Sequence, residues 1–433
     1  MSKIYKFKIL LCISGFLFGF TTVSQAQFSL TGEIRPRAEF RNGFKTLRPE
    51  KADPAFFVEQ RSRLYVAFKQ EKFHLQFNLQ DVRLWGNTSQ VYKTDEHSLT
   101  NVHEAYGEYF FSPKWSIKVG RQEIDYDNAR IMGNLGWAQQ SRSHDAALLK
   151  FENVEKGLRL HMGGAFNQGD IFEPGRLSGT YYEGINNYKT IQYIWLNKES
   201  DTGAFSILAL NSGYQTTDTT VQFMQTLGGA AHRKFGQVKL EGEFYYQLGK
   251  NADKRNVEAF MLSLSGSFPV GALLLTLGAD YLSGTKAGDK DQNAFTPLYG
   301  TNHKFYGFMD YFYVGNNHAQ AGNTAGLFDP FVKTKVKIGK GVLHIHGHYF
   351  MSAVEVLDVT DPGKNLSRGL GAEVDLVYQL KLMDAVTWHL GYSQLFATES
   401  MKALKNNAGA YDKLNQWAWT MITFKPQLFS TAK

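Results

Sequence analysis

Charged side chains recur at every second residue along the segment Phe28 to Arg41. Successive residues of a strand point to opposite faces, so this segment would have one polar face and one mostly apolar face. The polar face holds Ser29, Thr31, Glu33, Arg35, Arg37, Glu39 and Arg41. Guanidinium groups bind carboxylates through paired hydrogen bonds, so this face could attract anions, or its own carboxylates could pair with the arginines and brace the strand.

A second alternating segment repeats this chemistry. Arg61 and Arg63 alternate with an apolar set that contains Leu64, Val66 and Phe68. The carboxylates expected on the same inner face as the arginines are Glu33, Glu39, Glu104, Glu108, Glu241, Glu243, Glu373 and Asp375. The arginines of the first two segments favour a selective path for anionic solutes, and the alternative is that they serve only as structural ion pairs.

The elements that must position these side chains are strands. Eighteen alternating segments run from 28–41 to 416–424. A soluble sandwich would also alternate, but many of these segments have ten or more residues, whereas soluble strands have about five or six. A tilted strand needs about 9–11 residues to cross a bilayer. Charges that face mid-bilayer lipid cost about 2–4 kcal/mol each, so the charged faces must line the lumen.

The connections between the segments alternate between long and short ones, which is typical of an outer-membrane barrel. The even number of segments places both termini on the periplasmic side. We therefore predict an all-β fold, a transmembrane antiparallel up-and-down β-barrel of about 18 strands, which fills residues 27–433 as a single domain. The longest connection, Gly284 to Asp329, could fold into the lumen, cover the pore, or remain a surface loop.

The N-terminus has the pattern of a cleaved signal peptide. Lys3, Lys6 and Lys8 precede an apolar run from Ile9 to Phe20, and Ser24-Gln25-Ala26 supplies the small residues of a cleavage site. Cleavage after Ala26 removes three lysines and takes the net charge from +7 to +4. We expect residues 1–26 to direct the protein to the outer membrane of a Gram-negative cell, and an uncleaved anchor is the alternative.

Composition excludes several other classes of protein. The absence of a second long apolar run excludes a polytopic helical membrane protein, and the single cysteine excludes a disulfide framework. No basic tract indicates nucleic-acid binding. We expect no cofactor and no covalent chemistry, because no Ser/His/Asp set is brought together by the strand order.

Three histidines at alternate positions of one predicted strand are potential metal ligands. His344, His346 and His348 share one face of a strand. Side chains two residues apart on a straight strand are about 7 Å apart, too far to bind one metal ion unaided. We therefore predict no metal site and assign these histidines to the polar lining of the lumen.

One stretch is more specific than the alternation. Gly120-Arg121-Gln122 ends a strand, and Arg130 to Gly133, Trp137, Arg142 and Asp145 follow. A change of phase at Gly120, through a bulge, would turn Arg121 toward the lumen. With the opening strand Gly32 to Phe40 and with Arg61-Ser62-Arg63, this stretch resembles the alginate export family of outer-membrane porins. Ser143-His144 stands before Asp145 where that family often has an aromatic residue.

The resemblance implies an eighteen-stranded barrel whose arginine-lined constriction passes a polyanionic polysaccharide outward. It makes Arg63, Arg121 and Arg142 the best candidates for that constriction. The predicted lumen residues are Arg35, Arg37, Arg61, Arg63, Arg121, Arg142, Glu104 and Asp145.

We therefore predict an outer-membrane channel, not an enzyme, that passes alginate-like polyuronate or its oligomers by diffusion. The alternatives are a general porin for small hydrophilic solutes and, less favoured, an outer-membrane hydrolase. The expected partners are outer-membrane lipid, the anionic saccharide and periplasmic partners for export or uptake. By the same resemblance we expect a monomer.

Overall fold

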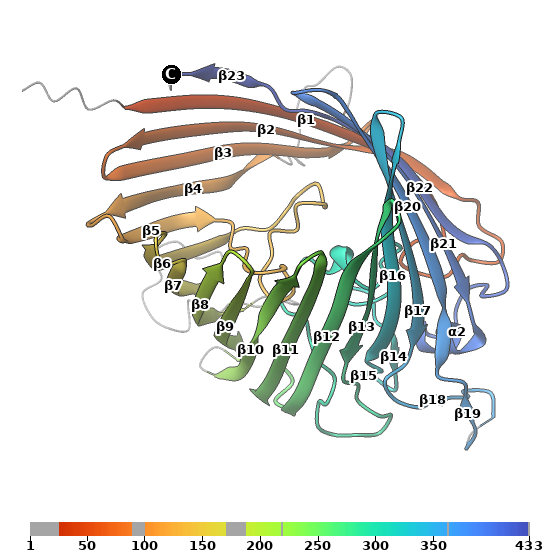
Figure 1. The fold of residues 1–433 in the computed structure, drawn as a ribbon. Coiled ribbons are helices and arrows are strands. Elements are labelled where there is room, and N and C mark those ends of the chain that lie inside the picture. The colour runs from red at the N-terminus through yellow and green to blue at the C-terminus, as the bar shows by residue number, and fades with distance from the viewer. Residues whose placement is uncertain (1–25, 89–99, 170–187, 218–219, 362, 432–433) are drawn as a thin grey trace, which may run out of the picture.

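The computed structural model describes residues 26–88, 100–169, 188–217, 220–361 and 363–431. Its strands form one antiparallel sheet that closes on itself, because β1 (Gln27–Asn42) pairs with β2 (Ala55–Gln70) on one side and with β22 (Asn415–Phe424) and β23 (Gln427–Ser430) on the other (Figure 1). β22 and β23 lie in line along β1 and count as one barrel strand. The fold is a closed 18-strand antiparallel barrel, as predicted.

The remaining barrel strands follow one another around the ring in chain order. They are β3 (Phe73–Leu84), β4 (Thr100–Phe110), β5 (Trp115–Gln122), β6 (His144–Asn153), β7 (Leu158–Phe166), β8 (Thr190–Ser200), β9 (Gly203–Gln215), β10 (Val221–Phe235), β11 (Val238–Lys250), β12 (Asn256–Val270), β13 (Leu273–Leu282), β16 (Leu327–Ile338), β17 (Gly341–Met351), β20 (Gly369–Met383) and β21 (Val386–Ala397). Each of the eighteen predicted segments overlaps one of these strands.

The two faces of the sheet differ as the alternation requires. Apolar side chains such as Leu64, Phe77 and Val119 are exposed on the outer face, while Glu33, Arg35 and Arg37 are buried on the inner face. An exposed apolar band around a closed barrel is the surface that lipid covers.

The two ends of the barrel also differ. Tight turns join the strands at one end of the barrel, the turn end, which also holds both chain termini. Longer connections lie at the opposite end, the loop end, which in outer-membrane barrels faces outward. The short elements of the loop end are η2 (Asn302–Lys304), β14 (Ala319–Gln320), β15 (Asn323–Thr324), β18 (Val356–Leu357), β19 (Asn365–Leu366) and α2 (Glu399–Leu404). None of the helices in the described ranges is both long and apolar enough to cross a membrane.

One prediction about the register was wrong. The ladders from β5 to β4 and β6 run past Gly120 without a break, so Arg121 keeps the phase of Ile117 and Val119 and lies on the outer face. The irregularity lies in β4 instead, where Asn78 and Leu79 of β3 pair with Glu104 and Val102 and leave His103 as an extra residue. This bulge is the reason that two adjacent side chains of β4, His103 and Glu104, both reach inner partners.

Candidate functional site

Residues 123–143, the first inner loop, leave β5 and fold into the barrel rather than over its rim. In Figure 1 this segment is the orange-yellow chain inside the ring. Arg35 donates to Gly136 O at 2.8 Å and to Gln139 Oε1 at 3.1 Å, and Arg61 donates to Ser141 Oγ at 3.0 Å. Arg35 and Arg61 both project from the inner face of the sheet, and both hold this loop.

Carboxylates of the barrel wall neutralise part of this arginine cluster. Glu33 accepts from Arg61 Nε at 2.8 Å and from the Tyr65 hydroxyl at 2.7 Å. Arg37 donates to Glu39 at 2.8 Å and also pairs with Glu59. The structure therefore contains the ion pairs of the alternative prediction, because these inner-face arginines are braced by neighbouring carboxylates.

Arg130 fixes the other side of the first inner loop across the barrel. Its guanidinium donates to Asp280 at 2.9 and 3.1 Å and to Ser263 at 3.0 Å, and Glu243 lies at 3.3 Å. Burial alone would lower the pKa of Arg130, but Asp280 and its other partners raise that pKa well above the ordinary arginine value. Arg130 is 3% exposed, so it is a buried ion-pair anchor between the loop and β11 to β13.

Residues 283–326, the second inner loop, also fold inward and pair with the first. Gly133 N donates to Tyr299 O at 2.9 Å, and Thr301 N donates to Ala129 O at 2.8 Å. Arg142 reaches across both loops, donating to Gly300 O at 3.1 Å and to Tyr299 O. Of the three positions predicted for the connection 284–329, the structure has the one inside the lumen.

The two inner loops concentrate backbone strain. Nine of the thirteen non-glycine residues with positive φ in the described part of the chain belong to them. They are Asp127, Ala129, Leu135, Ser141, Leu298, Tyr306, Asp310, Tyr313 and Ala321. Such conformations cost of order 1–3 kcal/mol each and persist only where the surroundings enforce them, which points to a functional constriction.

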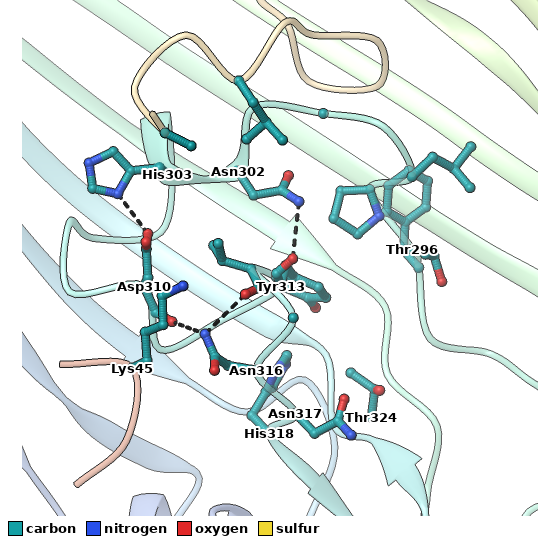
Figure 2. A pocket seen from close by; sticks show the side chains of 18 of the residues that line it. Lys45, Thr296, Asn302, His303, Asp310, Tyr313, Asn316, Asn317, His318 and Thr324 are labelled. Carbon is teal, nitrogen blue, oxygen red and sulfur yellow. Dashed lines mark hydrogen bonds and ion pairs between the residues drawn. The ribbon is translucent and has the colours of Figure 1, made fainter. Parts of the chain in front are cut away.

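A cavity of about 650 Å³ opens at the loop end above the two inner loops. Figure 2 shows polar side chains converging on it. His303 Nδ1 lies 2.7 Å from Asp310 Oδ1, and Asn302 Nδ2 donates to Tyr313 O at 3.1 Å. Trp137 stacks on His303 with ring centroids 4.7 Å apart, so the wall offers an aromatic face beside the polar groups.

Cations outnumber carboxylates around this loop-end cavity. Its charged lining is Arg37, Arg41, Lys45, Arg142 and Arg255 against Glu59, Asp253 and Asp310. Arg142 and Arg255 donate to backbone carbonyls, and neither forms an ion pair with a carboxylate of the described residues. Burial lowers the pKa of Arg142 to about 10, so it remains cationic at neutral pH.

A second cavity, of about 440 Å³, lies at the turn end beneath the first inner loop. Its charge balance is reversed, with Arg159 and Lys239 against Asp125, Asp127, Glu199, Glu241 and Glu243. Burial raises the pKa of both Asp125 and Asp127. The inner loops therefore separate a cation-rich cavity from an acidic one.

The predicted site residues divide into two groups. Arg63 donates to Gln80 at 2.6 Å, and Glu104 accepts from Asn78, so both belong to the inner wall with Arg35, Arg37 and Arg61, while Arg142 lies in the first inner loop. Arg121 and Asp145 instead pair with each other at 2.8 Å, with both side chains substantially exposed on the outer face. They are corrections to the predicted lumen set, since the unbroken register of β5 and β6 fixes their direction.

Sequence reasoning missed Lys45, Arg255 and Asp310 in the loop-end cavity. All three lie in connections, where no alternation indicates a face. The sequence also gave no indication of the role of Arg130, because its partners on β11 to β13 are more than a hundred residues away.

Comparisons with known proteins agree with this geometry. The alginate export family matches residues 26–167, which include β1 to β7, with the two strands of the arginine cluster, and the whole first inner loop. Over these residues the chain is a match to the alginate export family. No curated protein matches the chain.

Solved structures match the chain over nearly its whole length. OccD3 (OpdP) of Pseudomonas aeruginosa is 13% identical, with a TM-score of 0.58 and coverage of 93% of this chain and 92% of that one. OccAB4 of Acinetobacter baumannii is 10% identical, with a TM-score of 0.61 and coverage of 93% and 98%. OpdK of Pseudomonas aeruginosa, in a structure with vanillate, is 8% identical, with a TM-score of 0.58 and coverage of 92% and 98%. These matches establish the barrel fold.

Proposed function

We propose that this protein is an outer-membrane channel that passes anionic saccharides of the alginate-like polyuronate class by diffusion. The match to the alginate export family and the barrel fold support an outer-membrane channel. The finer choice of solute depends on the lumen.

The loop-end cavity carries the proposal. A polyuronate has one carboxylate per sugar, and guanidinium groups recognise carboxylates through paired hydrogen bonds. Arg142 and Arg255 hold positive charge that no described carboxylate neutralises, and Lys45 adds a third cation from a separate loop. Because these charges come from three connections, they surround the cavity rather than form a single patch.

Aromatic and amide groups supply what a sugar needs besides charge. Trp137 and Tyr313 line the same cavity, as do Asn302 and Asn316. Figure 2 shows the two asparagines anchored on the loop backbone, where Asn316 Nδ2 donates to Asp310 O at 2.8 Å. Apolar ring faces with a few fixed polar groups are the general composition of small-molecule sites.

The inner loops favour a selective channel over a broad porin. Two cross-linked loops occupy the lumen, and their strained backbone is held by the buried Arg130 ion pairs. The vanillate present in the OpdK structure is a carboxylate anion, so a barrel of this fold accommodates that chemistry in one other protein.

The direct test is conductance in a planar bilayer with a salt gradient. We expect an anion-selective reversal potential and current block by oligouronates, with no comparable block by a neutral oligosaccharide of equal length. Equal block by both sugars would support recognition of saccharides without recognition of charge. A large unselective conductance that neither sugar blocks would favour the general porin and reject the proposal.

A further inference from the structure

Two histidines and a carboxylate meet on the inner wall away from the arginine cluster. His346 and His348 lie on β17, and Asp375 lies on β20 directly opposite His346. One potential ligand atom from each of the three lies within 4.8 Å of the others. Because the two imidazole rings tilt toward each other, with centroids 6.4 Å apart, they approach more closely than side chains on a straight strand.

The imidazole ring of His348 is fixed by a carboxylate on one nitrogen, as the rings of metal-binding histidines commonly are. Its Nδ1 lies 2.9 and 3.0 Å from the two oxygens of Asp329 on β16, which leaves Nε2 as the available ligand atom. A carboxylate behind a histidine fixes the tautomer and the ring direction at most metal sites. His348 is 5% exposed and Asp329 is fully buried, so the pair is rigidly placed.

Two further polar atoms beside the cluster lack a partner among the described residues. They are His346 Nδ1 and Glu373 Oε2, both shielded from solvent. The Glu373 carboxyl does interact with the neighbouring carboxyl of Asp375. Glu373 is opposite His348 in the ladder and is 1% exposed. Buried polar atoms without partners are rare in native proteins, and an ion is one of the explanations to test first.

The second inner loop covers this cluster. Met309 N donates to Glu373 Oε1 at 2.8 Å, and Phe308 N donates to Asp375 Oδ2 at 3.4 Å. Gly307 makes this approach with a φ of +80°, and a Cβ there would lie 2.6 Å from Glu373 Oε1. On the other side, Ser393 Oγ donates to Asp375 Oδ1, so the carboxylate is oriented by protein groups on both oxygens.

We infer that His346, His348 and Asp375 form a binding site for a divalent transition-metal ion of the Zn²⁺ type. Zinc takes imidazole and carboxylate ligands at about 2.0–2.2 Å in a tetrahedral arrangement, and three protein ligands leave a position for water. In a tetrahedral site the ligand atoms lie closer together than 4.8 Å, so ion binding would require side-chain rotations that draw these three atoms toward one another. Ca²⁺ and Mg²⁺ prefer sites made of oxygen ligands, so this site discriminates against them.

Lys333 is a cation of the wall that opposes the ion. It lies on β16 directly opposite His346, and its ammonium sits 4.5 Å from the Phe331 ring. A second positive charge near the site weakens cation binding. Replacing this lysine should therefore tighten the site, an effect that a purely structural role for the cluster would not produce.

Isothermal titration of the tag-free, detergent-purified mature barrel with Zn²⁺ tests the site. We expect one equivalent to bind and Ca²⁺ not to compete. Asp329→Asn should weaken binding about 10–100-fold, as second-layer changes do at other sites. His346→Ala and Asp375→Asn should weaken it at least as much, and Lys333→Met should tighten it.

His344→Ala is the matched control. His344 lies on the same strand face but faces Lys335 and Val377 rather than a carboxylate, so its loss should leave Zn²⁺ binding unchanged. Heat-modifiable mobility on a gel verifies that each variant is folded. An absence of binding by the folded wild-type barrel, or an equal loss in His344→Ala, would overturn the site. Neither result would bear on the anion channel, which is tested by reversal potential.

Discussion

The two cavities inside the barrel have opposite charge balances although the same sheet encloses both. Five cations face three carboxylates at the loop end, whereas two cations face five carboxylates at the turn end. The loop-end excess comes largely from connections, through Lys45, Arg142 and Arg255, and the turn-end acids come largely from β8, β11 and the start of the first inner loop.

This difference indicates that the connections, more than the strands, set the charge of the loop-end cavity. The strand arginines Arg35, Arg37 and Arg61 are occupied by loop carbonyls or wall carboxylates. Their main effect is to place the first inner loop. In the channel proposed above, the loops would decide the sign of charge that a solute meets, and the attraction for anions would be strongest on the loop side of the constriction.

Replacing Arg130 should join the two cavities and abolish the difference in charge between them. Arg130→Met leaves Asp280 and Glu243 buried without their cation, and breaking such a pair costs about 3–5 kcal/mol. We expect the first inner loop to leave its position and the single-channel conductance to rise with loss of selectivity. Arg130→Lys keeps the charge but not the paired hydrogen bonds, so it should be intermediate. Wild-type conductance in Arg130→Met would show that the loop is held by other contacts.

Removing the unpaired loop cations should reverse the balance of the loop-end cavity. In Arg142→Gln/Arg255→Gln the amides can still donate to the loop carbonyls, while two positive charges disappear. We expect the reversal potential to move toward cation preference and the oligouronate block to weaken about ten-fold, or ~1.4 kcal/mol.

Arg121→Gln is the control for this pair of substitutions. It removes one arginine from the outer face of the barrel, where it meets Asp145 and not the lumen. Selectivity and block should stay at wild-type values. A shift as large as that of the double variant would mean that the loop cations have no special role.

Lowering the pH should have a smaller effect, which is to make the turn-end cavity less negative. The pKa values of Asp125 and Asp127 are raised by burial, so these side chains become neutral at a higher pH than ordinary carboxylates as the pH falls. The turn-end cavity then loses negative charge while the loop-end arginines keep theirs. We expect anion preference to increase on acidification, measured by reversal potential at a series of pH values. Asp125→Asn/Asp127→Asn should reduce that increase, and an unchanged pH profile would contradict the assignment.

Much of the barrel could be predicted from the sequence because its signal is local. The parity of Arg35, Arg37, Arg61 and Arg63 alone gives their inward direction, and strand length separates this barrel from a soluble sandwich. Gly120 misled the prediction because a glycine in a strand often marks a bulge. Here the bulge is at His103, a residue with no such mark.

The constriction could not be predicted because its contacts join distant parts of the chain. Arg130 meets Asp280 across 150 residues, and Arg142 meets Gly300 across 158. Irregular loops carry no periodicity that would give the direction of Arg255 or Asp310. The family resemblance marked the stretch from Gly120 to Asp145 as distinctive, but only the structure shows that residues 123–143 fold inward and what they touch.

The sidedness of oligouronate block tests directly whether the loop-end cations attract the polyuronate. Single barrels inserted in a known orientation would be exposed to the same oligouronate first from the loop end and then from the turn end. The charge asymmetry predicts half-block at a clearly lower concentration from the loop end, and the difference should shrink in Arg142→Gln/Arg255→Gln. Equal block from both ends, or stronger block from the turn end, would contradict the account.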